Sequence, residues 1–222
     1  AITIQGPKLI LDYSIFIGQF YVGLLILWTI LIFFGYIFLK KDVFRLMKVV
    51  REPTMLAFAT ASSESAYPKT MDALDKFGVP KRITSFVLPL GYSFNLDGSM
   101  MYMAFAVLFI AQAYNIDLSF TQQALILLTL MITSKGIAGV SRASIVVIAS
   151  TLAMFKLPEA GILLILAVDQ FVDMGRTATN VIGNSIATAV IARTEGNKHD
   201  LPEEEGVVVD TIVPVNRLAD NS

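Results

Sequence analysis

The chain has 222 residues, of which 55% are hydrophobic and 16% charged, and its mean hydropathy is +0.67. Because charged residues make up about a quarter of an average soluble domain, this composition indicates an all-α integral membrane protein. The net charge of -1 leaves no basic surface for nucleic acid, and the absence of cysteine excludes thiol catalysis, disulfides and Cys-ligated metals. The single histidine, His199, lies in a polar tail. We therefore expect neither an enzyme nor a metal cofactor.

The first strongly apolar segment, residues 14–39, is long enough to cross a bilayer, which takes about 20 residues. Residues 1–13 resemble the end of a preceding helix, so we expect that the chain is the C-terminal portion of a longer protein. After the span, up to residue 53, comes a linker with five basic residues, Lys40, Lys41, Arg45, Lys48 and Arg51. By the positive-inside rule we expect this linker to be cytoplasmic.

Three interrupted segments follow the linker. Residues 54–81 have short apolar halves around a Ser-rich centre and basic residues on both sides, which predicts a first re-entrant hairpin. Residues 82–121 predict a transmembrane helix broken at GYSFNLDGS, because Gly, Asn and Asp favour turns. Residues 122–157, broken at TSKGIAGVSRAS, predict a second re-entrant hairpin that enters from the extracellular face. Non-helical backbone at membrane depth is tolerated only where protein or a cavity covers it.

The last helix, residues 158–196, carries a polar stripe in an apolar sequence. Its members are spaced by 4, 3, 4 and 4 residues and share one helical face: Asp169, Asp173, Arg176, Asn180 and Asn184. A charged stripe in a membrane helix is costly unless it lines a protein interior or a cavity. Together with the paired interrupted segments, it predicts a secondary transporter with a site near the midplane. We expect residues 197–222 to form a cytoplasmic tail.

Each interruption offers a different chemistry. Serines beside Glu64 at the first tip could bind a carboxylate through hydroxyls and freed N–H groups, or could form a plain loop. Asn95 and Asp97 could supply the oxygen ligands that hard cations prefer. Alternatively, they could form a simple turn between two helices. Lys135 lies at membrane depth and must pair, deprotonate or reach the surface.

On the last helix, Arg176 suits a carboxylate and Asp173 suits an ammonium group. The pair could therefore hold an acidic amino acid at two points. Alternatively, the two residues form an internal ion pair that only ties helices together.

Four sequences, SSESAYP, NLDGS, SKGIAGV and DMGRTATNVIGN, resemble those of the glutamate transporter family, the dicarboxylate/amino acid:cation symporters, over about Phe20–Gly196. The resemblance implies a transport domain of two hairpins and two main helices, which moves as an elevator against a trimeric scaffold. The complete protein would be a homotrimer in the bacterial inner membrane. The scaffold spans are absent from this chain.

The resemblance also implies residue roles. Ser63 would contact the substrate α-carboxylate, Asp173 its amino group and Arg176 its side-chain carboxylate. Other implied substrate positions are Ser99, Thr177, Asn180 and, in the extracellular gate, Gly139. Positions implied in cation or proton coupling are Glu64, Gly91, Asn95, Asp97, Lys135 and Asn184.

Three departures from the family pattern bear on the coupling ion. Sodium-coupled members carry Asp at the position of Asn184 and an uncharged residue at that of Lys135, whose charge should compete with bound sodium. The proton-carrying Glu of animal members aligns with Met103. We therefore expect a proton symporter like those of the bacterial branch, with Glu64 and Asp97 as candidate proton carriers. A sodium-coupled carrier stays open.

The substrate can be argued from Asp173. Members that carry C4-dicarboxylates lack this Asp, and a dicarboxylate has no ammonium to pair with it. Retention of both Asp173 and Arg176 therefore favours glutamate or aspartate. Carriers of C4-dicarboxylates, neutral amino acids or cystine remain alternatives on the same fold, and a fragment without transport activity is an alternative of another class.

Overall fold

The computed structural model describes residues 2–135 and 142–195, and within these ranges the ordered elements are helices, without a strand. In chain order they are α1 (Ile2–Leu39), α2 (Asp42–Val49), α3 (Arg51–Thr60), α4 (Ser63–Phe77), α5 (Lys81–Phe94), α6 (Asp97–Ala113), α7 (Phe120–Thr133), α8 (Ala143–Met154), a 3-10 turn (Glu159–Gly161), α9 (Ile162–Leu166) and α10 (Asp169–Glu195). The expected all-helical class is confirmed. A single helix, α1, covers the position near residue 13 where we expected a boundary.

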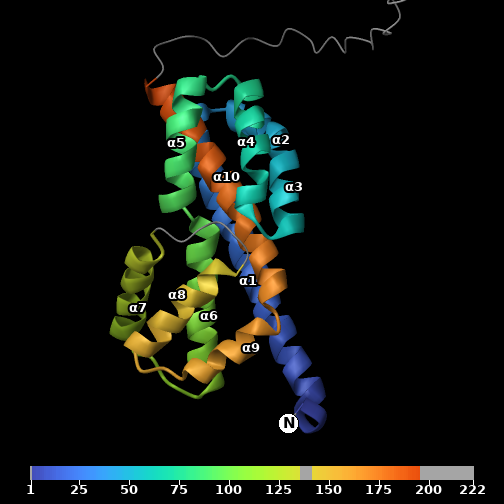
Figure 1. Ribbon diagram of the computed structural model, residues 1–222, viewed down its shortest axis with the longest axis vertical. Coiled ribbons are helices and arrows are strands. Elements are labelled where there is room, and N and C mark those ends of the chain that lie inside the picture. The colour runs from blue at the N-terminus through green and yellow to red at the C-terminus, as the bar shows by residue number, and fades with distance from the viewer. Residues whose placement is uncertain (1, 136–141, 196–222) are drawn as a thin grey trace, which may run out of the picture.

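Helix α10 forms the axis of the molecule and contacts α1, α3, α4, α5 and α6. In Figure 1, α2 to α5 gather around its C-terminal half, whereas α6 to α9 form a second group near its beginning, with α1 running past both groups. Two side-chain bonds join α1 to α10: Trp28 Nε1 donates to Thr179 Oγ1 at 2.7 Å, and the Tyr21 hydroxyl donates to the Phe171 carbonyl at 2.7 Å. The polar stripe of α10 is therefore enclosed by helices from distant parts of the chain.

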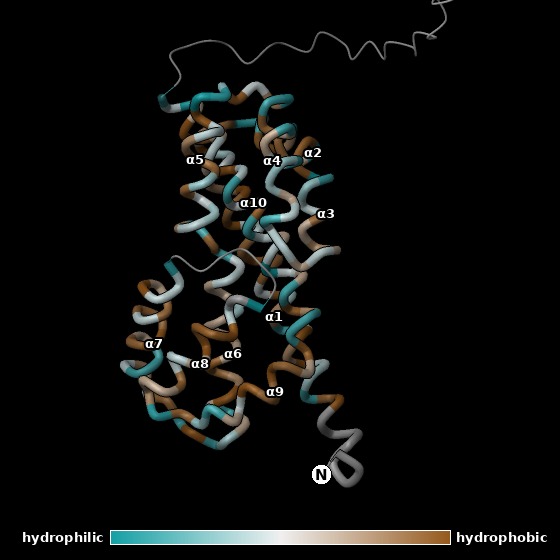
Figure 2. Tube along the Cα trace, viewed as in Figure 1, coloured by the Kyte–Doolittle hydropathy of each residue, from teal (hydrophilic) through white to brown (hydrophobic). Residues whose placement is uncertain are grey.

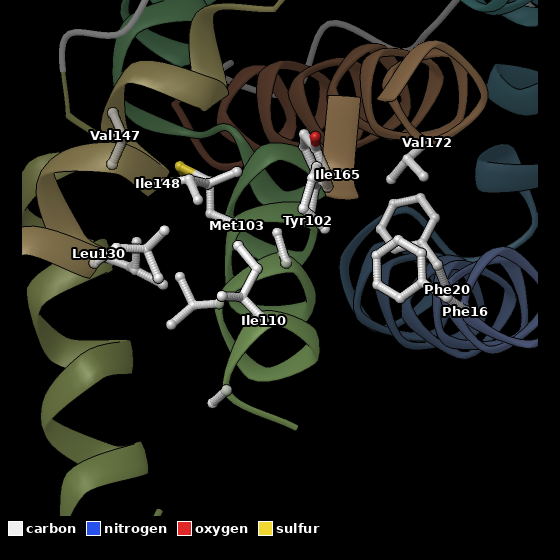
Figure 3. Packing of buried hydrophobic residues seen from close by; sticks show 14 of the residues in the cluster. Phe16, Phe20, Tyr102, Met103, Ile110, Leu130, Val147, Ile148, Ile165 and Val172 are labelled. Atoms are coloured by element: carbon white, nitrogen blue, oxygen red, sulfur yellow. The ribbon is translucent and has the colours of Figure 1, made fainter. Parts of the chain in front are cut away.

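Each helical group has its own hydrophobic core. One core joins α1, α6, α7, α8 and the start of α10, and Figure 3 shows part of it around Tyr102 and Ile110. The other core joins α2, α4 and α5 to the C-terminal half of α10. A small third cluster, Ala57, Ala66 and Val181, packs α3 and α4 against the middle of α10. These small side chains let the three helices approach closely.

Two stretches could cross a membrane by length and composition, Ile10–Leu39 and Lys81–Ala113. Apolar residues recur along most of the helices, including those at the outside of the arrangement (Figure 2). On α1 the exposed apolar side chains include Val22, Leu25, Ile26, Phe33, Phe34 and Ile37. A helix that is apolar all round is typical of a membrane span or of the core of a large assembly.

Candidate functional site

The middle of α10 carries buried polar side chains. Asp169, Asp173, Arg176, Thr177 and Asn180 are 0% exposed, and Asn184 is 1% exposed. Burial of polar and charged groups is costly unless each finds a partner. The contacts of these side chains therefore define what the stripe does.

Asp173 and Arg176 pair with each other one helical turn apart. The Arg176 Nε–H donates to Asp173 Oδ1, and Arg176 Nη1 donates to the Ser99 hydroxyl at 2.9 Å. The second Asp173 oxygen, Oδ2, accepts the backbone N–H of Arg142 at 3.1 Å. The structure thus brings Ser99, Asp173 and Arg176 together, and the two charges neutralise each other.

Asn180 closes the start of α6. Its Oδ1 accepts the backbone N–H groups of Gly98 at 2.9 Å and Ser99 at 3.3 Å, while its Nδ2 donates to the Ser99 hydroxyl at 2.9 Å. The first N–H groups of a helix have no intrahelical partner, and the residue before α6, Leu96, cannot cap it. A side chain of α10 therefore caps α6. Close approach is needed here, since a Cβ on Gly98 would collide with the Arg176 carbonyl.

The chain between α5 and α6 is held by contacts from other elements. Lys135 Nζ donates to the Phe94 carbonyl, the last of α5, at 2.6 Å. Asn95 Nδ2 donates to Asn184 Oδ1 at 3.1 Å. Since the last carbonyls of a helix have no partner within the helix, Lys135 serves as a cationic cap for the exposed end of α5.

Besides Asn184 Nδ2, the break leaves a carboxylate atom unsatisfied among the described residues, in Asp97. Its Oδ2 is buried and has no hydrogen-bond partner within the described ranges. A Cβ added to Gly183 would meet this oxygen, and one added to Gly91 would meet Asn184. The two glycines therefore allow the polar groups of the break to lie directly against the backbone of their neighbours.

Helix α3 meets α10 at Thr177, whose hydroxyl donates to the Ala57 carbonyl at 3.0 Å. Ser63 begins α4 and is buried, and its Oγ has no hydrogen-bond partner in the described part of the chain. Glu64 follows it in the first turn of α4 and is exposed. Gly139 lies outside the described residues. No group of three or more His, Cys, Asp or Glu that could hold a metal ion occurs among the residues described.

Sequence reasoning missed two members of the cluster, Tyr102 and Arg142. The Tyr102 hydroxyl donates to Asp169 Oδ1, and Arg142 Nε lies 3.5 Å from Asp169 Oδ2. Asp169 was noticed on the stripe but received no role. Its position one turn before Asp173, together with a lone arginine in the apolar segment around residue 142, was the available signal.

Comparison with known proteins gives the context for this site. A model of the sodium:dicarboxylate symporter family matches residues 1–194. The chain belongs to this family. The symporter family consists of transporters, and the expectation that the chain is not an enzyme is confirmed.

Individual relatives differ in what their names say they carry. The chain is 50% identical over 165 residues to a proton/sodium-glutamate symport protein of Bacillus caldotenax. The matched stretch covers 74% of the chain and 38% of the relative. It is 49% identical over 154 residues to the proton/glutamate-aspartate symporter of Escherichia coli, covering 69% and 35%. A C4-dicarboxylate transport protein of Paracoccus denitrificans is 41% identical over 197 residues, covering 86% and 42%. The chain thus spans less than half the length of these relatives.

Proposed function

We propose that the chain forms the substrate-carrying part of a symporter that imports glutamate or aspartate. The observation that carries this proposal is the buried Asp173–Arg176 pair, whose arginine also bonds Ser99. A substrate with one ammonium and one side-chain carboxylate can replace this internal pair by two pairs of its own. The ammonium takes Asp173 and the carboxylate takes Arg176, so neither buried charge is left without a partner.

The same charge balance argues against other substrates. A C4-dicarboxylate would satisfy Arg176 but leave Asp173 without an ammonium, and a neutral amino acid would satisfy Asp173 but leave Arg176 without a carboxylate. An unpaired buried charge costs several kcal/mol, roughly 3–5 in measured cases. Two of the relatives above are named as glutamate symporters, in agreement with this choice.

Proton coupling is proposed from the break between α5 and α6. Lys135 places a fixed positive charge on the Phe94 carbonyl at 2.6 Å, where the resemblance implies a cation site. At the neighbouring site, Asn184 stands where sodium-coupled members carry a carboxylate. The buried Asp97 oxygen, which lacks a hydrogen-bond partner within the described residues, can be satisfied by a proton. Glu64 is the second candidate proton carrier, at the exposed start of α4.

The remaining features of the proposal concern architecture. The short turn between α3 and α4 supports a first re-entrant hairpin, and the two-residue interval between α5 and α6 supports a broken transmembrane helix. The α7–α8 pair would form the second hairpin. The full-length protein would be a homotrimer of the bacterial inner membrane that works by an elevator movement.

Glutamate uptake by the complete protein in proteoliposomes tests the function. With an acid exterior and no sodium we expect uptake that a protonophore abolishes and that aspartate inhibits at far lower concentrations than succinate or cystine. Inhibition by succinate alone would instead indicate a C4-dicarboxylate carrier. Uptake that requires sodium would refute proton coupling while leaving the substrate assignment intact.

A further inference from the structure

Arg142, the residue that precedes α8, makes two contacts with α10. Its backbone N–H donates to Asp173 Oδ2 at 3.1 Å, and its Nε lies 3.5 Å from Asp169 Oδ2. Asp169 and Asp173 are four residues apart and therefore lie one above the other on the same face of α10. One residue thus reaches two buried carboxylates, one with its main chain and the other with its side chain.

The ion pair is suited to holding the start of α8 in place. The Asp169 side chain is 0% exposed, and its other oxygen accepts the Tyr102 hydroxyl from α6. This carboxylate is therefore fixed on two helices before Arg142 reaches it. Arg142 itself has φ 65°, the left-handed region that a non-glycine residue adopts only when its surroundings impose it. No side chain caps α8 at this residue.

We propose that Arg142 is a positioning residue for the ammonium end of the substrate site. Its pairing with Asp169 holds the backbone N–H against Asp173, and this N–H fixes the rotation of the Asp173 carboxylate. The inference rests on the proposed function, in which Asp173 receives the substrate ammonium. When the substrate replaces Arg176 at Asp173 Oδ1, the N–H of Arg142 remains to orient Oδ2.

The consequence is selective for ligands that carry an ammonium. Without the guanidinium, the start of α8 is released from Asp169 and Asp173 loses its oriented donor. The Arg176 end of the site keeps its Ser99 contact, because Arg142 does not touch either residue. Binding of a ligand without an ammonium, such as glutarate, should therefore change less than binding of glutamate.

The test uses the complete protein in detergent, with Kd for glutamate and inhibition constants for glutarate measured by competition against labelled aspartate. The variants are Arg142→Gln, Arg142→Lys, Asp169→Asn and the double variant Arg142→Gln/Asp169→Asn. Lys156→Gln is the matched control, because Lys156 lies at the other end of α8, is exposed and also has a left-handed backbone, with φ 54°. Its ammonium forms no ion pair with the described residues.

We expect Arg142→Gln to raise the glutamate Kd about fivefold, near the upper range for an ion pair with one exposed partner, while the glutarate constant changes less than about twofold. Arg142→Lys should lie closer to wild type. Asp169→Asn should match Arg142→Gln, and the double variant should be no worse than either single one. The inference would be overturned if Arg142→Gln weakened the binding of glutamate and glutarate equally, or if its glutamate Kd equalled that of Lys156→Gln. It would also be overturned if the Kd increase of the double variant were the product of the two single increases. Should Asp169→Asn fail to fold, the Gln and Lys variants of Arg142 decide alone. Failure of the wild type to bind glutamate would refute the proposed function instead.

Discussion

Replacement of Arg176 by cysteine separates substrate recognition from structural pairing. In the structure Arg176 is fully buried and donates to Asp173 and Ser99. Truncation of one partner in a buried, hydrogen-bonded charge pair costs about 2–5 kcal/mol. Since 1.4 kcal/mol is tenfold in affinity, a loss near 3 kcal/mol raises the Kd for aspartate by roughly a hundredfold. The variant should also admit neutral amino acids, because its site no longer holds an unpaired cation.

The assay is competition of aspartate, glutamate and serine against a labelled substrate bound to the complete protein. The matched control is Arg193→Cys, which makes the same chemical change at an exposed position in the last turn of α10. These 222 residues contain no cysteine, so each variant adds a single thiol within them.

A stability measurement completes the test. Arg176→Cys leaves Asp173 with only the Arg142 N–H as a donor among the described contacts, so the variant should melt at a lower temperature than wild type. Adding Asp173→Asn removes the uncompensated charge and should restore part of the melting temperature without restoring aspartate binding. Aspartate affinity that survives Arg176→Cys would refute the role of Arg176 as the reader of the side-chain carboxylate.

Three further changes test the break between α5 and α6. Asn180→Ala removes the cap from the buried start of α6 and should cost about 1–2 kcal/mol of stability, measured by thermal unfolding in detergent. Asn180→Asp keeps an acceptor and should cost less. Equal losses of stability in the two variants would contradict the capping role. Lys135→Met removes the cation from the Phe94 carbonyl and should make uptake less dependent on the pH gradient or responsive to sodium; unchanged proton-driven uptake would remove Lys135 from the mechanism. Gly98→Ala should destabilise the protein because its Cβ meets the Arg176 carbonyl. The control Gly18→Ala, whose Cβ has nothing within 4 Å, should be neutral or stabilising by up to about 1 kcal/mol. Equal melting temperatures of the two variants would contradict the close approach of α6 and α10.

The sequence was sufficient for those parts of the site that one helix determines. Residues spaced by three and four positions, such as Asp173, Arg176 and Asn180, share a face whatever the rest of the chain does. Their burial followed from the apolar sequence around them. The membrane class and the helical fold followed in the same way from composition and segment length.

Contacts between distant segments could not be read from spacing. Nothing in the sequence indicates that Asn180 caps α6, because helix capping usually comes from a neighbouring residue and Leu96 stands there instead. The pairing of Arg142 with Asp169 joins residues 27 positions apart and depends on how α8 packs against α10. Near residue 13, where a boundary was expected, the structure has the single helix α1; that residues 1–13 form the end of a preceding helix stays a prediction.

The contacts of Asp173 explain why an internal ion pair and a substrate site are compatible readings of the same residues. In the structure every charge of the Asp173–Arg176 pair is neutralised inside the protein, so the substrate-free site can be buried without a free ion. Binding must then exchange this pair for substrate contacts, and this exchange limits the affinity for the substrate. A ligand that supplies only one of the two charges binds more weakly still, because it leaves the other buried charge unpaired. The arrangement therefore favours discrimination over tight binding. The bond between Asp173 and Arg176 does not itself tie helices together, because the two residues lie on the same helix one turn apart; only their further contacts with Ser99 and Arg142 do so. Of the bonds in this cluster that join helices, those of Asn180, Thr177 and Asp169 involve neither member of the pair, and they would persist if the pair opened.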